Sequence, residues 1–158
     1  MRMDGKIVLV MVTGASSGVG FAAARRLAEL GAALAMVCRD ANRGEAAAAE
    51  VAKVATGPAP VLLLADLLSQ DSIRLFCNRV HDRFDRVDVL LNNAGAMFDR
   101  RELSVGGIEK TLAVNHLAPF LLTGLLLDLV RKGTAPRIIT VASESHSGSI
   151  DFANLQGE

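Results

Sequence analysis

The sequence predicts an α/β domain built on a doubly wound parallel sheet of about five strands, in the order 3-2-1-4-5. Short apolar runs alternate with segments of helical period along all 158 residues, and this alternation is typical of parallel strands joined by right-handed crossovers. A glycine-rich turn follows the first apolar run, and polar residues follow the others. The length fits a single domain over residues 1–158, long enough to bury a sizeable core.

The first three elements follow a strand–helix–strand pattern. Lys6 to Val12 is a continuous apolar run, which predicts a strand buried on both faces. Gly18 to Leu30 is predicted to be a helix because its apolar residues recur at helical spacing, and Gly31 suits the C-cap position. Ala33 to Cys38 is the second apolar run and the second predicted strand.

The middle of the chain repeats this pattern. Asp40 suits the N-cap of an alanine-rich helix that runs to Val54 and is stopped by Gly57-Pro58. Val61 to Ala65 is the third predicted strand, and Ser69 opens a helix with apolar residues at helical spacing up to Phe84. Val87 to Leu91 is the fourth predicted strand.

The last third holds one long helix and one strand. The helix is expected from about Gly107 to Val130, and Pro119 inside it should kink or divide it. Arg137 to Val141 is the fifth predicted strand. The polar, glycine-containing tail from Glu144 to Glu158 is predicted to be loop.

Composition excludes several classes of function. Seventeen basic residues balance seventeen acidic ones, which argues against a nucleic-acid partner. The most apolar stretch, Leu117 to Leu127, ends at Asp128 and is too short to span a bilayer, and Met1 to Lys6 shows no signal peptide. We therefore expect no membrane span. Cys38 and Cys77 are predicted to be buried thiols in a reducing cytoplasm, and no metal site is expected.

The turn after the first strand has the form G-x-x-x-G-x-G. Gly14 would permit the tight turn, Gly18 would let the backbone approach a pyrophosphate, and Gly20 would let the helix pack closely on the sheet. Phosphates would lie at the helix N-terminus, where N–H groups favour anions. This predicts a Rossmann-type dinucleotide site. A purely structural turn and a methyltransferase loop are the alternatives, and the latter lacks its usual acid before the glycines. The loop's predicted cofactor-binding residues are Gly14, Ser16, Ser17, Gly18, Val19 and Gly20.

The end of the second strand indicates which dinucleotide is bound. An NAD enzyme of this type usually places an acid there for the ribose 2′-hydroxyl. Here Arg39 takes that place, a guanidinium suited to a 2′-phosphate, and Asp40 is better used as a helix cap. The sequence thus predicts NADP over NAD, the alternative being that Arg39 is only a solvated loop charge.

Polar or glycine residues fall at the carboxyl ends of all five predicted strands. In a sheet ordered 3-2-1-4-5, strands one and four flank the switch point beyond which ligands bind. We expect one site at that edge, built from Gly14, Arg39, Asp66, Asn92 and Ser143.

At these positions the chain resembles the short-chain dehydrogenase/reductase family. Thr13 to Gly20 matches the family's TGxxxGxG loop, and Asn92-Asn93-Ala94-Gly95 matches its NNAG motif. The resemblance implies that Asn115 and Ser143 belong to the catalytic set. It also implies further cofactor contacts at Asp66, Leu67, Asn92, Ala94 and Gly95.

The resemblance runs from Gly5 to Glu158 and is strongest to a retinol-dehydrogenase-like subgroup. His146, three residues after Ser143, and the closing Asn154-Leu155-Gln156-Gly157-Glu158 are similar to that subgroup. An apolar alcohol or carbonyl compound is the substrate it suggests. His116 is expected to fill a core or interface position rather than to catalyse.

The sequence departs from the family in having no tyrosine. The family's Tyr-x-x-x-Lys, whose phenol is the general acid/base, is missing, so we expect a truncated chain without activity of its own. The fifth strand should be an open edge. Self-association is expected through that edge or through Leu121 to Val130.

Two functions therefore remain open. One is an NADP-dependent oxidoreductase that transfers hydride between an alcohol and a ketone or aldehyde. The other is a dinucleotide-binding module without chemistry. The glycine loop with Asn115 and Ser143 favours the first, and the missing Tyr and Lys favour the second.

Overall fold

A computed structural model describes residues 5–11, 18–143 and 149–158 of the chain. Its five strands form one parallel sheet in the order β3-β2-β1-β4-β5, as the sequence predicts. The strands are β1 (Ile7–Met11), β2 (Ala33–Cys38), β3 (Val61–Leu64), β4 (Val89–Asn92) and β5 (Arg137–Thr140).

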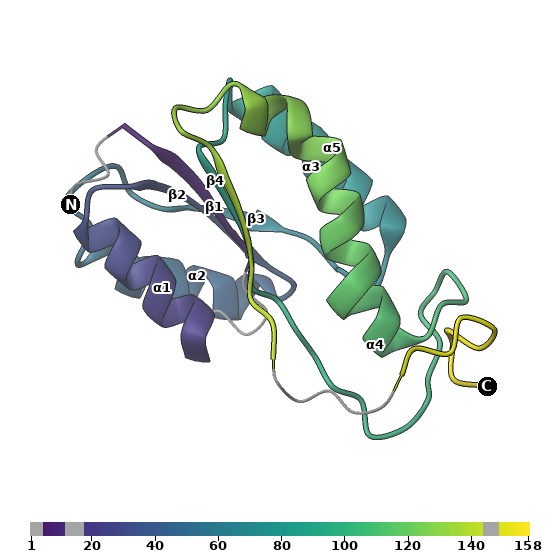
Figure 1. Ribbon diagram of the computed structural model, residues 1–158. Coiled ribbons are helices and arrows are strands. Elements are labelled where there is room, and N and C mark those ends of the chain that lie inside the picture. Colours follow the sequence, from purple (N-terminus) through teal and green to yellow (C-terminus); the bar gives the residue numbers. More distant parts are fainter. Residues whose placement is uncertain (1–4, 12–17, 144–148) are drawn as a thin grey trace.

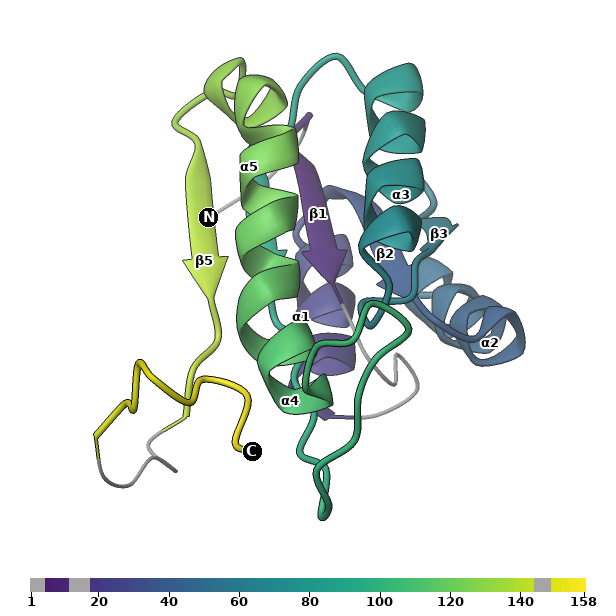
Figure 2. The same ribbon diagram turned by 90° about the vertical axis from the view of Figure 1, so that its right-hand side faces the viewer.

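Helices cover both faces of the sheet (Figure 1). Helices α1 and α2 lie on one face, and α3 and α5 lie on the other. All the strands point the same way, so their carboxyl ends meet at one edge, beside α4 (Figure 2). The helical segments are α1 (Gly18–Glu29), α2 (Ala41–Ala52), α3 (Gln70–Arg83), α4 (Lys110–Leu112), the π-helical turn η1 (Ala113–Leu117) and α5 (Ala118–Arg131).

The two helix layers explain why the strands are continuously apolar. Along β2, Ala35 and Val37 pack into the core under α3 and α5. The alternate residues Leu34, Met36 and Cys38 pack into the core under α1 and α2. Successive side chains of a strand point to opposite faces, so a strand with helices on both sides must be apolar at every position.

Local signals set most element boundaries. The Asp40 carboxylate accepts from the Arg43 N–H at 2.8 Å and starts α2, and Ser69 Oγ accepts from the Ser72 N–H at 3.2 Å and starts α3. Gly31 follows α1 with a φ of +89°, a conformation that favours glycine. These three predictions are confirmed. Helix α2 ends at Ala52, two residues before the predicted Val54.

The predicted long helix over Gly107 to Val130 differs from the structure. Its helical part begins at Lys110, three residues later, because the Glu109 carboxylate caps the first turn. The division comes before Pro119 rather than at it, through the π-helical turn Ala113–Leu117. Proline has no N–H for the carbonyl four residues earlier, and the wider turn accommodates that loss.

This helical run is also the most apolar part of the chain. By length and composition alone, Lys110–Arg131 could cross a membrane, although the sequence predicts that no segment is long enough. In the structure the run packs on α3 and the sheet, with 39% of its most apolar window buried. The absence of a membrane span and the cytoplasmic location therefore stay predictions.

Strand β5 forms one edge of the sheet, as expected. Among the described residues it pairs only with β4, and all four of its residues are exposed. Ile138 and Ile139 expose 42% and 46% of their surface. Self-association through this edge stays a prediction.

Candidate functional site

The structure brings the predicted site residues that it describes to the carboxyl edge of the sheet (Figure 2). Gly18 begins α1, Arg39 follows β2, Asp66 follows β3, and Asn92 ends β4. Gly14, Ser16 and Ser17 lie outside the described residues, as does His146. The topological switch point that the sequence predicts is therefore present, between β1 and β4.

The start of α1 has the conformation that the glycine pattern requires. Gly18 has a φ of +80°, which L side chains rarely adopt, and no described atom lies within 4 Å of where its Cβ would stand. Val19 is exposed, and Gly20 is one of the buried residues of α1. The helix has no acidic residue in its first turn, so its N–H end is free of a competing carboxylate of its own.

A small hollow lies between the ends of β2 and β3. Arg39, Asp66, Leu67 and Ala96 all line it. Asp66 is fixed in a tight turn, because its carboxylate accepts from the Leu68 N–H at 3.0 Å. Arg39 is exposed and forms no ion pair or side-chain hydrogen bond with any residue that the structure describes. It is thus a cation open to a ligand.

Asn92 is the last residue of β4, one position beyond the predicted strand, and is only 4% exposed. Its Nδ2 donates to Thr123 Oγ1 on α5 at 3.2 Å. Its Oδ1 is buried and has no hydrogen-bond partner among the described residues. A buried acceptor without a donor costs roughly 1–3 kcal/mol, so a ligand or water that donates here would be favoured.

Asn115 lies in the π-helical turn and holds the loop after β4. Its Oδ1 accepts from the Ala96 N–H, and its Nδ2 donates to the Ala96 carbonyl, both at 2.8 Å. The side-chain amide thus bonds both backbone groups of Ala96, as a neighbouring strand would, and holds the loop that contains Ala94 and Gly95. Both polar atoms of the Asn115 side chain form these hydrogen bonds, so in the structure Asn115 positions that loop.

The remaining predicted residues follow β5 or flank the helix. Ser143 is exposed and lies three residues beyond the end of β5. His116 is exposed rather than in the core, so that part of its prediction is wrong. It lies on the outer side of the π-helical turn, where its ring stacks on Phe120 at 6.5 Å between centroids.

Sequence reasoning missed several contributors to this site. Thr123 binds Asn92, and Ala96 binds Asn115. Phe98 and Val114 line the hollow beside Arg39. Thr123 could have been found, because it lies eight residues after Asn115 and therefore on the same helix face. The others give no pattern in the sequence.

Cysteine and metal chemistry contribute nothing visible here. Cys38 and Cys77 are buried, as predicted, and no disulfide joins them. Burial raises the pKa of the Cys77 thiol to about 12, although nearby Arg74 opposes the shift. A thiol with such a pKa is inert near neutral pH. Among the residues that the structure describes, no cluster of His, Cys, Asp or Glu could hold a metal ion.

These features fit a bound dinucleotide. A glycine with positive φ opens the first helix, Arg39 follows β2 without a described partner, and a buried amide oxygen at the end of β4 has no donor among the described residues. The family model for short chain dehydrogenases matches residues 8–153. The chain belongs to the short-chain dehydrogenase family. Members of this family are oxidoreductases that bind NAD(P).

Among relatives of this short-chain dehydrogenase is human retinol dehydrogenase 11. It is 40% identical over 160 residues, which cover all of this chain and 49% of the relative. Mouse retinol dehydrogenase 14 is also 40% identical, over 99% of this chain and 49% of its own length. The chain thus spans about half the length of the curated relatives that it matches.

Solved structures of the family share the fold. A protein of Mycobacterium paratuberculosis superposes with a TM-score of 0.81 at 36% identity, covering 98% of this chain and 53% of its own. Pseudomonas aeruginosa RhlG, solved with NADP in its active site, gives a TM-score of 0.77 at 28% identity, over 98% of this chain and 62% of its own.

Proposed function

We propose that the protein is an NADP-dependent oxidoreductase that interconverts an apolar alcohol and its ketone or aldehyde. The observation that carries the choice of NADP is Arg39, an exposed cation at the end of β2 without a described partner. A 2′-phosphate would give this guanidinium a charge-assisted, bidentate partner. The NADP complex of the relative RhlG supports the same choice.

The proposal assigns a role to each group at the sheet edge. The N-terminus of helix α1 would hold the pyrophosphate, since its free N–H groups favour anions. Asp66, Leu67 and Ala96 would line the adenine side of the site. When bound, the nicotinamide would supply or accept a hydride. Asn92 Oδ1, buried without a described donor, would accept a hydrogen bond from the bound ligand or from water.

Ser143 and Asn115 would act near the reacting carbon. In the proposal the Ser143 hydroxyl orients the substrate carbonyl by donating a hydrogen bond to its oxygen. Asn115 acts through Ala96, because its amide holds the loop after β4 in place. A serine alone is not a general acid, so a further group with a suitable pKa must move the proton.

A dinucleotide-binding module without chemistry is the second candidate. The 158 residues contain no tyrosine, which is the residue type of the family's general acid/base. We propose that these 158 residues bind NADP(H) without turnover by themselves. Sequencing the coding DNA beyond Glu158 separates the candidates: an in-frame Tyr-x-x-x-Lys favours the enzyme, and a stop codon favours the module.

Calorimetric titration of the chain with NADPH and NADH tests the cofactor assignment. Arg39→Ala should weaken NADPH binding by about 10- to 100-fold, the worth of a hydrogen bond to a charged group. NADH binding should stay within about twofold, because it has no 2′-phosphate. The control is Arg43→Ala, an exposed arginine on α2 that does not line the hollow. An unchanged NADPH affinity in Arg39→Ala would overturn the assignment.

A further inference from the structure

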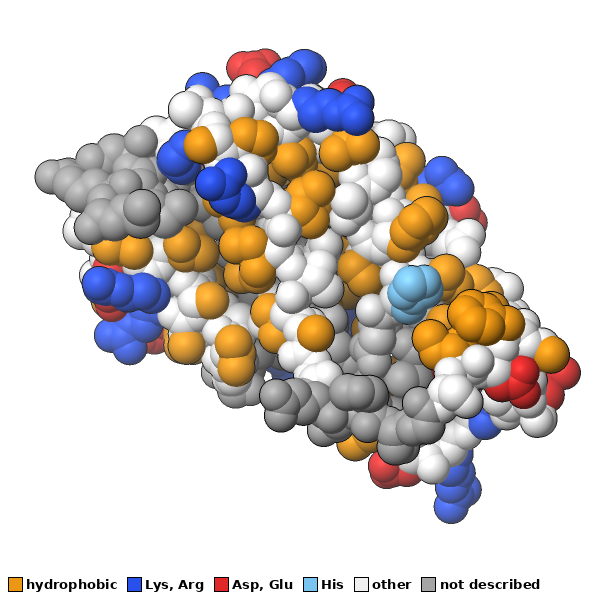
Figure 3. Space-filling view, in the orientation of Figure 1, with side chains coloured by type: hydrophobic (Ala, Val, Ile, Leu, Met, Phe, Trp, Pro, Cys, Tyr) orange, Lys and Arg blue, Asp and Glu red, His pale blue; other side chains and the backbone are white. Residues whose placement is uncertain are grey.

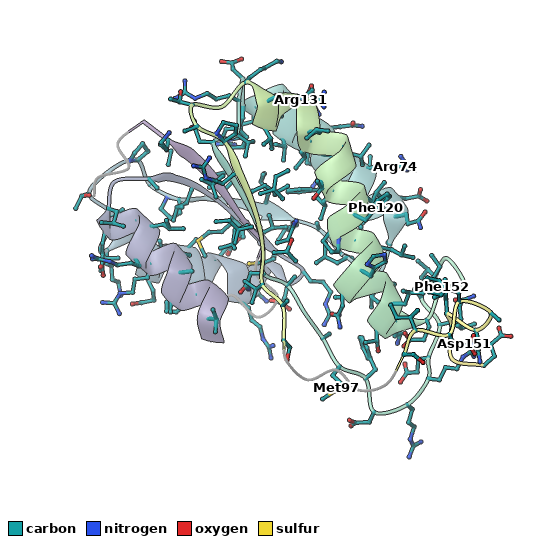
Figure 4. The ribbon with its side chains drawn as sticks, in the orientation of Figure 1. Arg74, Met97, Phe120, Arg131, Asp151 and Phe152 are labelled. Atoms are coloured by element: carbon teal, nitrogen blue, oxygen red, sulfur yellow. The ribbon has the colours of Figure 1, made fainter. Side chains whose placement is uncertain are left out.

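Phe98 turns inward from a loop whose neighbouring side chains are exposed. Met97, Asp99 and Arg100 are exposed, whereas Phe98 between them is half-buried. Figure 4 shows Met97 on this loop, at the lower edge of the molecule, and Figure 3 shows charged side chains of both signs there. The loop therefore takes one aromatic ring partly out of water while its neighbours stay exposed.

Two anchors fix the position of Phe98. Two residues earlier, the Asn115 amide holds both backbone groups of Ala96, at 2.8 Å each. At Phe98 itself, Lys110 Nζ lies over the ring, 5.5 Å from its centroid. A cation over an aromatic face is attracted by the π electrons of the ring, so Lys110 holds the Phe98 ring in its orientation.

Lys110 is itself fixed by a short hairpin over residues 102–110. Its N–H donates to the Glu102 carbonyl at 2.9 Å, and nearer the turn the Ser104 N–H donates to the Ile108 carbonyl at 2.7 Å. The Lys110 Nζ also pairs with the Glu102 carboxylate at 2.5 Å. Glu102 thus holds both the backbone and the side chain of Lys110, so the cation is in place over Phe98 before any ligand binds.

The Phe98 side chain lines the small hollow between the ends of β2 and β3, together with Arg39. The rest of the wall is mainly apolar and includes Val37, Leu67 and Val114. An aromatic ring and a guanidinium plane are the two kinds of side-chain surface on which flat nucleotide bases stack. An aliphatic ligand needs neither of them, so this pair of side chains favours a base.

We infer that Phe98 is a specificity-determining residue for the purine base of the dinucleotide, and that Lys110 is the positioning residue that holds its ring. The base stacks on Phe98, and Arg39 binds the 2′-phosphate beside it. This inference rests on the proposed function for the identity of the ligand as NADP(H). The two residues then differ in effect: Phe98 contributes equally to NADPH and NADH, which share the base, and Arg39 contributes to NADPH alone.

The chain offers a direct reporter of stacking because it contains neither tryptophan nor tyrosine. Phe98→Trp places a single indole at the wall of the hollow. Met97→Trp, at a position 87% exposed in the parent chain, is the matched control on the same loop. The probe is adenosine 2′,5′-bisphosphate, the adenine half of NADP, and ribose 5-phosphate is the probe without a base. We expect saturable quenching by the adenosine bisphosphate in Phe98→Trp, and no saturable quenching in Met97→Trp or with ribose 5-phosphate.

Calorimetric titration with NADPH and NADH asks whether the ring of Phe98 binds or only its volume. Phe98→Leu keeps an apolar side chain but removes the ring, and it should weaken the binding of both cofactors by about tenfold, the effect of losing one stacked base. Phe98→Tyr keeps a ring and should bind both within about twofold of the parent chain. Met97→Leu is the control for the loop, and urea unfolding midpoints should match that of the parent.

Lys110→Gln tests the positioning role. It removes the charge over the ring and should weaken NADPH and NADH equally, by about threefold. Because Lys110 acts through Phe98, the same change in the Phe98→Leu background should cause no further loss. A full additional loss in that background, or a loss for NADPH alone, would overturn the positioning role, since Lys110 would then act on the fold or on the 2′-phosphate.

The outcomes distinguish a failure of this inference from a failure of the proposed function. Unchanged NADPH and NADH affinities in Phe98→Leu, or equal quenching in the two tryptophan variants, would overturn the inference even if Arg39→Ala selectively weakens NADPH binding. Conversely, a loss of both cofactors in Phe98→Leu with an unchanged NADPH affinity in Arg39→Ala would keep the inference and overturn the choice of NADP. A parent chain that binds neither the cofactors nor adenosine 2′,5′-bisphosphate would overturn both.

Discussion

The two ends of the sheet use buried polar groups in opposite ways. At the amino end, Asp88 is fully buried and well supplied with partners. It accepts from the Thr134 N–H at 2.7 Å and Arg86 Nε at 3.3 Å, and Lys6 Nζ lies 3.7 Å away. At the carboxyl end, four residues along the same segment, buried Asn92 has an oxygen without a described donor.

We propose from this difference that the amino end is built for stability and the carboxyl end for binding. At the amino end the backbone is tightly packed at Gly133, where a Cβ would come 2.6 Å from the Val87 carbonyl oxygen. At the carboxyl end, a Cβ on Gly18 would meet no described atom within 4 Å. Substitutions at the amino end should therefore change unfolding, and those at the carboxyl end should change ligand binding as well.

The largest effect is expected for Asp88→Ala. It leaves the Thr134 N–H without its acceptor and two cations without their counter-ion, which should lower the free energy of unfolding by about 3 kcal/mol. Urea denaturation measures this loss. NADPH affinity of the folded protein should stay within about twofold, because ligands bind at the opposite edge of such sheets. A loss of binding at full folding would contradict the division of roles.

Asn115→Ala should rank second. It removes both hydrogen bonds to Ala96, at a cost of about 2 kcal/mol in the free energy of unfolding, and it should also weaken NADPH binding because the loop after β4 is released. Asn78→Ala is the matched control: this asparagine is exposed on α3 and has no side-chain hydrogen bond in the described part of the structure. Equal effects of the two variants in calorimetry and urea denaturation would argue against the positioning role.

A smaller effect is expected for Thr123→Val. The change keeps the shape of the side chain and removes the acceptor of Asn92 Nδ2, which should cost about 1 kcal/mol of stability. It should also let the Asn92 amide reorient, so NADPH binding should weaken slightly. Thermal unfolding with and without NADPH measures both effects. A variant more stable than the parent would show that this hydrogen bond does not hold Asn92.

The smallest effect is expected for Glu109→Gln, and it depends on pH. Partial desolvation raises the pKa of Glu109, but hydrogen bonds from the Thr111 and Leu112 N–H groups outweigh it and lower that pKa below 4.5. The ionised cap therefore stabilises the protein above pH 4.5, and this contribution is lost as the pH falls through the lowered pKa.

Glu109→Gln should thus cost about 0.5 kcal/mol near neutral pH, a typical helix-terminus interaction, and less in acid. Urea unfolding at several pH values measures it, with Glu45→Gln, exposed on α2, as the control. A loss of stability in Glu109→Gln that grows as the pH falls would contradict the capping role of the ionised carboxylate.

The sequence predicted the parts of the fold that depend on local signals. The Asp40 and Ser69 caps act on residues within three positions. The alternation of elements and the handedness of crossovers indicate a parallel sheet, and the strand order 3-2-1-4-5 is that of the Rossmann-type fold. The predicted family is confirmed by the family model, which matches residues 8–153. It could be recognised from sequence because its motifs are short and contiguous.

What the sequence could not predict depends on contacts between distant residues. Asn115 and Ala96 are 19 residues apart, and no periodicity links a side-chain amide to a loop backbone. His116 is exposed within the π-helical turn, a break in the helical period that the sequence does not indicate. The position of the irregular tail depends on a contact of the same kind. The Gln156 side chain accepts a hydrogen bond from the Glu109 N–H, 47 residues away.

Hydrogen–deuterium exchange of the chain with and without NADPH tests the central claim most directly, that the carboxyl edge of the sheet is the binding edge. We predict NADPH-dependent protection at the start of α1, around Arg39 and in residues 92–96. The amino end, including Gly133 and Thr134, should exchange at the same rate in both conditions. Protection at the amino end, or none at the carboxyl end under saturating NADPH, would contradict the account.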